Sequence, residues 1–118
     1  MSSKYLVIHM SDPTGTELPQ DEDQAILERW AEEGHTAGRL EMGAPVAGAE
    51  QAKSVAVRGG QTLITDGPFP EFKEWFAGYD LITAESIDEA AEFMAKHPVA
   101  INGRIYILPL VKLPWERD

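Results

Sequence analysis

The spacing of apolar residues changes from a strand pattern to a helix pattern and back, and it does so twice along the 118 residues. Residues 4–10 alternate with apolar side chains on both sides, as in an interior strand that is covered on two faces. From Gln20 the apolar positions recur at helical spacing, and Gly34 and Gly38 offer places for that helix to stop. Residues 40–46 form the next predicted strand. The first half of the chain therefore has the order strand, helix, strand.

The second half repeats this order. Residues 78–84 are predicted to form a strand, and the Ser-Ile-Asp-Glu sequence at 86–89 is a capping box that begins a helix. Pro98 cannot continue that helix, so we expect it to end near His97. A last strand is predicted over residues 104–111.

Between the two halves lies a predicted β-hairpin. Residues 54–57 and 62–65 are short β-prone runs, and Gly59-Gly60 between them suits a tight two-residue turn. Residues 70–76 are then predicted to form a short helical turn.

The order β-α-β, hairpin, β-α-β predicts one α+β domain over residues 1–118 with a ferredoxin-like arrangement. Right-handed crossovers place both helices on one face of an antiparallel sheet in such a domain. The opposite face still carries apolar residues and has no helix to cover it. Because burial of apolar surface is worth roughly 25 cal/mol per Å², we expect a homodimer that joins two such faces.

The composition argues against several classes of function. A net charge of −10 repels phosphate backbones and anionic membranes, so neither direct nucleic-acid binding nor membrane binding is expected. The sequence has no cysteine, no apolar run near the roughly 18 residues of a spanning helix and no signal-peptide core, so we expect a cytoplasmic protein. Its three histidines lack metal-binding spacing and no cofactor motif occurs, so neither a metal nor a cofactor is expected.

The turn Asp66-Gly67-Pro68 holds a carboxylate in a restrained corner at the end of a predicted strand. Functional carboxylates often project from strand ends, which makes Asp66 the first catalytic candidate. The alternative is structural, because an aspartate in such a turn commonly accepts hydrogen bonds from nearby backbone amides.

The histidines also have two interpretations each. His97, at the end of the second predicted helix, is either a general acid/base or a cation that the helix C-terminus stabilises. His9 is a rival imidazole near the end of the first strand, or an ordinary histidine on a sheet face. His35 lies between two helix-stopping glycines and is expected to be exposed.

An aromatic cluster follows the Asp-Gly-Pro turn, and it either packs in the core or lines a pocket for a ligand or partner. Its members are Phe69, Phe72, Trp75, Phe76 and Tyr79.

These features together resemble a known family, the DGPF branch of the YCII-related proteins. The resemblance extends over nearly the whole chain, from Lys4-Tyr5 to residues 107–110. The sequences that carry it are Leu-Ile-Thr-Asp-Gly-Pro-Phe at 63–69, Glu71, Lys-Glu at 73–74, Gly-Tyr-Asp-Leu-Ile at 78–82, Arg-Gly-Gly at 58–60 and Asp-Glu-Ala at 88–90.

The resemblance implies a dimeric ferredoxin-like fold, similar to an α/β-barrel, with a cleft at the barrel. A paired His and Asp in many members implies enzymatic activity, and one relative removes chloride from a chlorinated hydroxyquinol. Some DGPF domains are fused or adjacent to sigma factors, which implies a role near transcription instead. Asp66 matches the family aspartate. The family histidine usually lies on the first helix, where residues 25–30 of this chain contain none, so His97 or His9 would have to replace it.

Two functional hypotheses follow. In the first, the protein is a small-molecule enzyme, similar to a lyase or dehydrohalogenase, in which Asp66 and His97 form the catalytic pair and His9, Phe69 and Tyr79 contact the substrate. In the second, it is a non-catalytic ligand-binding or protein-interaction module, associated with a sigma factor, in which backbone amides bind Asp66. The sequence does not indicate the substrate.

Overall fold

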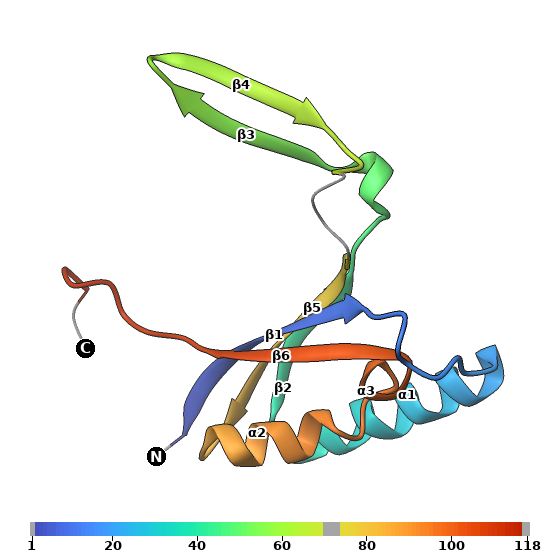
Figure 1. Ribbon diagram of the computed structural model, residues 1–118. Coiled ribbons are helices and arrows are strands. Elements are labelled where there is room, and N and C mark those ends of the chain that lie inside the picture. The colour runs from blue at the N-terminus through green and yellow to red at the C-terminus, as the bar shows by residue number, and fades with distance from the viewer. Residues whose placement is uncertain (1, 70–73, 117–118) are drawn as a thin grey trace.

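The computed structural model describes residues 2–69 and 74–116, and its main body is a four-stranded antiparallel sheet with helices on one face (Figure 1). The strands lie in the order β2-β5-β1-β6, which is the order of a ferredoxin-like α+β fold. Two helices make the crossovers, α1 between β1 and β2 and α2 between β5 and β6. The bounds are β1 (Ser3–Ser11), α1 (Gln20–Thr36), β2 (Leu40–Pro45), β5 (Phe76–Ala84), α2 (Ile87–Met94) and β6 (Gly103–Pro109).

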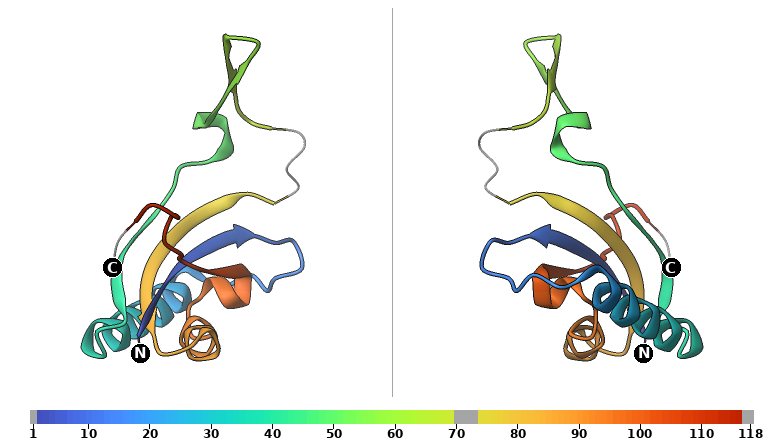
Figure 2. Two further views of the ribbon diagram at one scale, coloured as in Figure 1. Left: turned by 90° about the vertical axis from the view of Figure 1, so that its left-hand side faces the viewer. Right: turned by 90° about the vertical axis from the view of Figure 1, so that its right-hand side faces the viewer.

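The central strand β1 pairs with β5 on one side and with β6 on the other, so it is an interior strand as its sequence predicts. Its alternate residues Tyr5, Val7 and His9 are buried on the face that the helices cover. The residues between them are only half-buried, because that face of the sheet has no helix against it (Figure 2).

The core lies between this sheet face and the two long helices. The α2 residues Ala90, Phe93 and Met94 are almost completely buried, and the ring of Phe93 stacks on Trp30 of α1 with centroids 5.2 Å apart. The remaining core residues come from the two central strands, and they are Tyr5, Val7, Ile82 and Ala84. Trp30 therefore joins α1 to α2 above the middle of the sheet.

The predicted hairpin is present as a separate two-stranded sheet of β3 (Lys53–Arg58) and β4 (Gln61–Asp66). Gly59 and Gly60 form its turn with φ of 56° and 79°, values that favour glycine. The hairpin projects away from the main sheet, and it is joined to β2 through the 3-10 helix η1 (Ala49–Gln51) (Figure 1). Most of its side chains are exposed.

The structure differs from the sequence-based prediction where the second helix ends. Helix α2 stops at Met94 rather than near His97, and a short helix α3 (Val99–Asn102) begins directly after Pro98. Proline suits the start of a helix, because its missing N–H would have no intrahelical partner there. His97 is thereby placed in the junction between two helices instead of on the last turn of one.

The predicted helical turn over residues 70–76 lies mainly outside the described residues, and Phe76 begins β5. None of the helices in the described ranges has the length and apolar character needed to cross a membrane.

Candidate active site

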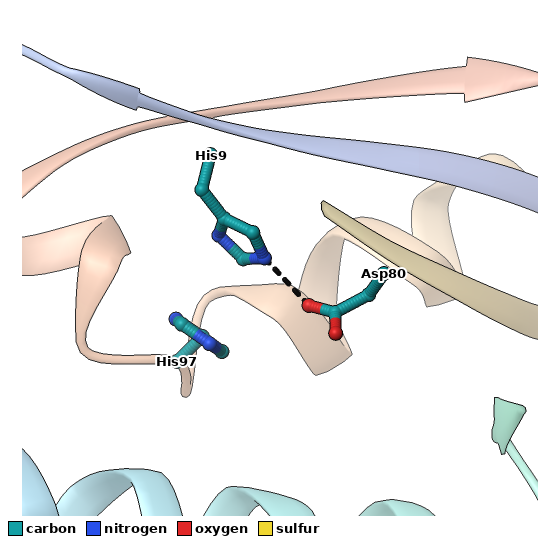
Figure 3. Close-up of side chains that lie close together, drawn as sticks. All are labelled: His9, Asp80 and His97. Atoms are coloured by element: carbon teal, nitrogen blue, oxygen red, sulfur yellow. Dashed lines mark hydrogen bonds and ion pairs between the residues drawn. The ribbon is translucent and has the colours of Figure 1, made fainter. Parts of the chain in front are cut away.

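His9 and Asp80 come together because their strands are neighbours in the middle of the sheet. In the register of β1 and β5, His9 is opposite Gly78 and Asp80 is opposite Val7, so the two side chains are diagonal neighbours on the helix-covered face. Gly78, opposite His9, lies against β2, where a Cβ atom built on it would come within 2.9 Å of the backbone oxygen of Ala44. Nε2 of His9 lies 2.5 Å from Oδ2 of Asp80, and both residues are buried, with 5% and 7% of their surface exposed (Figure 3).

His97 completes the cluster from the junction between α2 and α3 (Figure 3). Its ring lies 4.3 Å from that of His9, centroid to centroid, and meets Trp30 edge-on at 4.6 Å. The backbone N–H of Val99 donates a hydrogen bond of 3.1 Å to Nδ1 of His97. Since Nδ1 accepts, the hydrogen of the neutral ring must be on Nε2.

The electrostatics of the cluster keep His97 neutral. Burial, followed by the electrostatic effect of the neighbouring His9, lowers the pKa of His97 from 6.5 to about 3. At neutral pH the imidazole of His97 is therefore a hydrogen-bond donor through Nε2 and carries no charge.

The hydrogen bond also defines the tautomer of His9. An ionised carboxylate only accepts hydrogen bonds, so Nε2 of His9 is the donor to Asp80 and Nδ1 has the lone pair. Nδ1 is buried and accepts no hydrogen bond from any described residue. Protonation of Nδ1 would bury an N–H that has no acceptor among the described residues.

Gly43 allows the carboxylate to take this position. It is directly opposite Asp80 across β2 and β5, and a Cβ atom built on Gly43 would collide with Oδ1 of Asp80. Any larger residue on β2 at this point would therefore push the carboxylate away from His9.

The three residues line a cavity of about 590 Å³ that opens between α1, β2, β5 and the junction before α3. Most of the remaining lining is apolar, and it includes Leu27, Trp30, Leu40, Met42, Pro45 and Val99. Asp23, His35 and Tyr79 are the other titratable residues of the lining. The cavity is thus an apolar space with one buried polar cluster, the usual composition of a site for a small organic molecule.

Two histidines and one carboxylate with ligand atoms within 4.8 Å of one another are also a residue set that can hold a metal ion. The hydrogen bonds in this cluster oppose that use. Nδ1 of His97 already accepts from Val99, Nε2 of His97 has the hydrogen, and Nε2 of His9 is bonded to Asp80. A metal ion would have to displace at least one of these hydrogen bonds, whereas proton transfer uses them as they stand.

The structure brings together His9 and His97, two of the residues selected from the sequence, but it places Asp66 elsewhere. Asp66 is at the end of β4, its side chain is 77% exposed, and it forms an ion pair with Lys53 of the same hairpin. Asp66 does not line the cavity. The expected contact between Asp66 and His97 is therefore absent within the chain, and the carboxylate beside an imidazole is Asp80.

The two aromatic candidates also separate. Phe69 packs near Trp75, with ring centroids 6.4 Å apart, and does not line the cavity. Tyr79 does line it, although its position next to Asp80 on β5 directs its side chain to the opposite face of the sheet. Phe72 lies outside the described residues. Substrate contacts by Phe69 and Tyr79 remain predictions.

Sequence reasoning missed Asp80, although the sequence contains an indication of it. An aspartate in the alternating apolar strand 78–84 occupies a core-facing position, and His9 does the same on the first strand. Buried charged residues are rare unless they are paired. Two such residues on strands predicted to be neighbours were therefore candidates for a pair.

Comparison with known proteins identifies the family. The sequence model of the YCII-related domain matches residues 3–115. The chain belongs to the YCII-related domain family. A segment of 57 residues is 39% identical to an uncharacterised protein of Rhizobium meliloti (strain 1021). That match spans 48% of this chain and 46% of the relative, so it covers about half the length of each protein.

We predict that Gly43→Ala disrupts the pair of His9 and Asp80. The added methyl group displaces the carboxylate, and such overpacking costs about 1–3 kcal/mol of folding free energy. Urea unfolding measures the loss, and long-range ¹H–¹⁵N NMR of the His9 ring measures the change at Nε2. In an Asp80→Ala background the same substitution should cost less, because the clash with the carboxylate is gone and only the close approach to the backbone oxygen of Tyr79 remains. Equal costs in both backgrounds would contradict this account.

We predict that His97 makes stability fall in acid. Its folded pKa of about 3 is below the unfolded value of 6.5, so the unfolded chain binds the extra proton between these values. The contribution is complete above pH 6.5 and is lost as pH decreases from 6.5 toward 3. The expected slope from this group is about 1.4 kcal/mol per pH unit. Urea unfolding at a series of pH values should show a smaller slope for His97→Gln. The control His35→Gln replaces an exposed histidine of the cavity lining and should keep the slope of the unmodified protein.

Proposed function

We propose that this YCII-related protein is a small-molecule enzyme in which His9 and Asp80 act as one acid/base pair. The observation that carries the proposal is the buried hydrogen bond of 2.5 Å between these residues at the wall of an apolar cavity. Buried ionisable groups in a cavity are costly for folding, and they cluster at catalytic sites because proton transfer requires them.

The pair suits proton transfer because His9 and Asp80 stabilise each other both before and after the pair takes a proton. At rest, the imidazole of His9 donates to the Asp80 carboxylate and holds it in one orientation. When the pair takes a proton from a substrate, the proton belongs to the two residues together, as in other strongly coupled sites. Positioned acid/base groups of this kind accelerate reactions by about 10²–10⁴-fold.

The cavity supports an organic substrate with a reactive C–H or O–H group. Its walls are mainly aliphatic and aromatic, which favours an apolar molecule that leaves water on binding. Within this proposal the reaction belongs to the lyase or dehydrohalogenase type: the pair removes a proton from carbon, and the electron pair left behind expels a leaving group or stays in a conjugated system. The Asp-Gly-Pro-Phe sequence at 66–69 supports a place in the DGPF branch of the family.

A test of proton abstraction does not need the natural substrate. A panel of weak carbon acids is incubated with the protein in D₂O, and exchange of hydrogen for deuterium is followed by ¹H NMR. We expect the protein to accelerate exchange for apolar members of the panel, and we expect Asp80→Asn and His9→Gln to lower the rate by about 10²-fold or more. Glu92→Gln, which removes an exposed carboxylate of α2, is the matched control. Exchange by Asp80→Asn at the unmodified rate would contradict the role of the pair.

A second proposal concerns assembly, and the observation behind it is the uncovered face of the sheet. Helices cover only one face (Figure 2), while Tyr106 and Leu108 on β6 are 45% and 42% exposed on the other. The hairpin adds Val55 and Ile64, which are 68% and 62% exposed, and an isolated two-stranded hairpin is marginally stable in water. A homodimer that covers these surfaces is therefore part of the proposed functional state.

We predict that the protein sediments as a dimer at micromolar concentration and that Tyr106→Glu with Leu108→Glu makes it monomeric. Two charges in the centre of an apolar contact must lose their water without a partner, which is costly. Sedimentation velocity measures the outcome. Ile87→Glu is the control, because Ile87 is 44% exposed but belongs to α2 on the helix-covered side. A monomer in the unmodified protein would refute this assembly.

A further inference from the structure

We infer that His97 is the oxyanion-stabilising residue of this site, donating its Nε2 hydrogen to a substrate oxygen that becomes negative as the pair of His9 and Asp80 takes a proton from the adjacent carbon. The substrate class that fits is a carbon acid activated by a carbonyl or by an equivalent conjugated oxygen. This inference rests on the proposed function and adds to it the electrophilic partner and the substrate chemistry.

The first step of the argument is the direction of the hydrogen bonds around His97. The backbone N–H of Val99, the first residue of α3, donates to Nδ1 over 3.1 Å. A backbone donor at the start of a helix cannot reverse its role, so it selects the tautomer with hydrogen on Nε2. His97 therefore offers the cavity a donor and has no free lone pair with which to act as a second base.

The second step is charge. Burial and the adjacent imidazole of His9 oppose an imidazolium at His97, and they outweigh the Asp80 carboxylate, whose hydrogen bond goes to His9. The titratable groups that share the cavity with it are His9, Asp80, Asp23, His35 and Tyr79. A neutral imidazole at neutral pH suits an oxyanion because it stabilises negative charge through its N–H and keeps its proton.

The third step is placement. The ring of His97 lies 4.3 Å from that of His9, and all three residues have ligand-type atoms within 4.8 Å of one another. A proton acceptor and a hydrogen-bond donor at this separation can address neighbouring atoms of one small molecule. The described part of the cavity lining has no lysine or arginine, so the Nε2 hydrogen of His97 does not compete there with a permanent cation.

The chemical step balances with these groups alone. The pair of His9 and Asp80 accepts the proton from carbon, and the electrons of that C–H bond form a carbon–carbon double bond. The carbonyl π electrons move onto oxygen, which becomes an enolate oxygen hydrogen-bonded by Nε2 of His97. Return of the electrons restores the carbonyl and either takes a proton back from the pair or expels a leaving group from the neighbouring carbon.

The test uses 4-nitrophenol as a stable mimic of an enolate, because its absorbance distinguishes the phenol from the phenolate. We expect the 118-residue protein to bind the phenolate and to lower the apparent pKa of the bound ligand. His97→Phe keeps an aromatic ring but has no donor, and it should weaken phenolate binding by roughly 10- to 150-fold, the range for one hydrogen bond to a charged group. His97→Gln, whose amide can donate, should recover part of the affinity.

Two results would overturn the inference: no phenolate binding by the unmodified protein at millimolar ligand, or equal affinity in His97→Phe. Long-range ¹H–¹⁵N NMR gives an independent readout, since it must show hydrogen on Nε2 and none on Nδ1 of His97 from pH 5 to 8. The deuterium-exchange assay separates this inference from the proposed function. If Asp80→Asn loses exchange but His97→Phe binds the phenolate as the unmodified protein does, the inference is wrong and the proposed function stands. If phenolate binding depends on His97 but the unmodified protein accelerates no exchange, the acid/base proposal is wrong and the oxyanion site stands.

Discussion

The hydrogen bond between His9 and Asp80 is the constraint on which the arrangement of this domain depends. It joins the two central strands β1 and β5 on the face that must also hold the apolar core. A buried carboxylate without a hydrogen-bond partner would cost much folding free energy. The two strands must therefore keep the register that places His9 beside Asp80. A slip of one residue in either strand would turn that strand's member of the pair to the other face and leave its partner buried alone.

Close backbone approach on β2 and β5 gives this pair its space. Gly78 lets β5 lie close to the β2 backbone at Ala44, and Gly43 lets the Asp80 carboxylate lie against β2. Glycine weakens a strand, since it adds no packing and loses more chain entropy than other residues. The glycine of the edge strand β2 is therefore explained by the site rather than by the stability of the sheet.

Much of the fold could be predicted from the sequence, because apolar periodicity and turn chemistry are local. The capping box at 86–89 begins α2 as expected, since Ser86 Oγ accepts from the Glu89 N–H, and the two glycines make the hairpin turn. The site could be predicted only in part. Asp80 and His9 are 71 positions apart and meet through strand register, which no local pattern contains. Asp66 drew attention because Asp-Gly-Pro-Phe is a compact local sequence, but its carboxylate is on the exposed hairpin beside Lys53.

Two buried polar groups without hydrogen-bond partners lie close to the pair of His9 and Asp80. Nδ1 of His9 and Nε1 of Trp30 are buried without a hydrogen-bond partner among the described residues, and both rings pack against His97. Each such group costs about 1–3 kcal/mol, and native domains contain few of them. Two of them around one imidazole, next to a cavity of about 590 Å³, are hard to explain by folding alone. Their position is explained if this part of the core binds a reacting ligand. Functional sites retain groups that lower the stability of the fold, because the chemistry requires them.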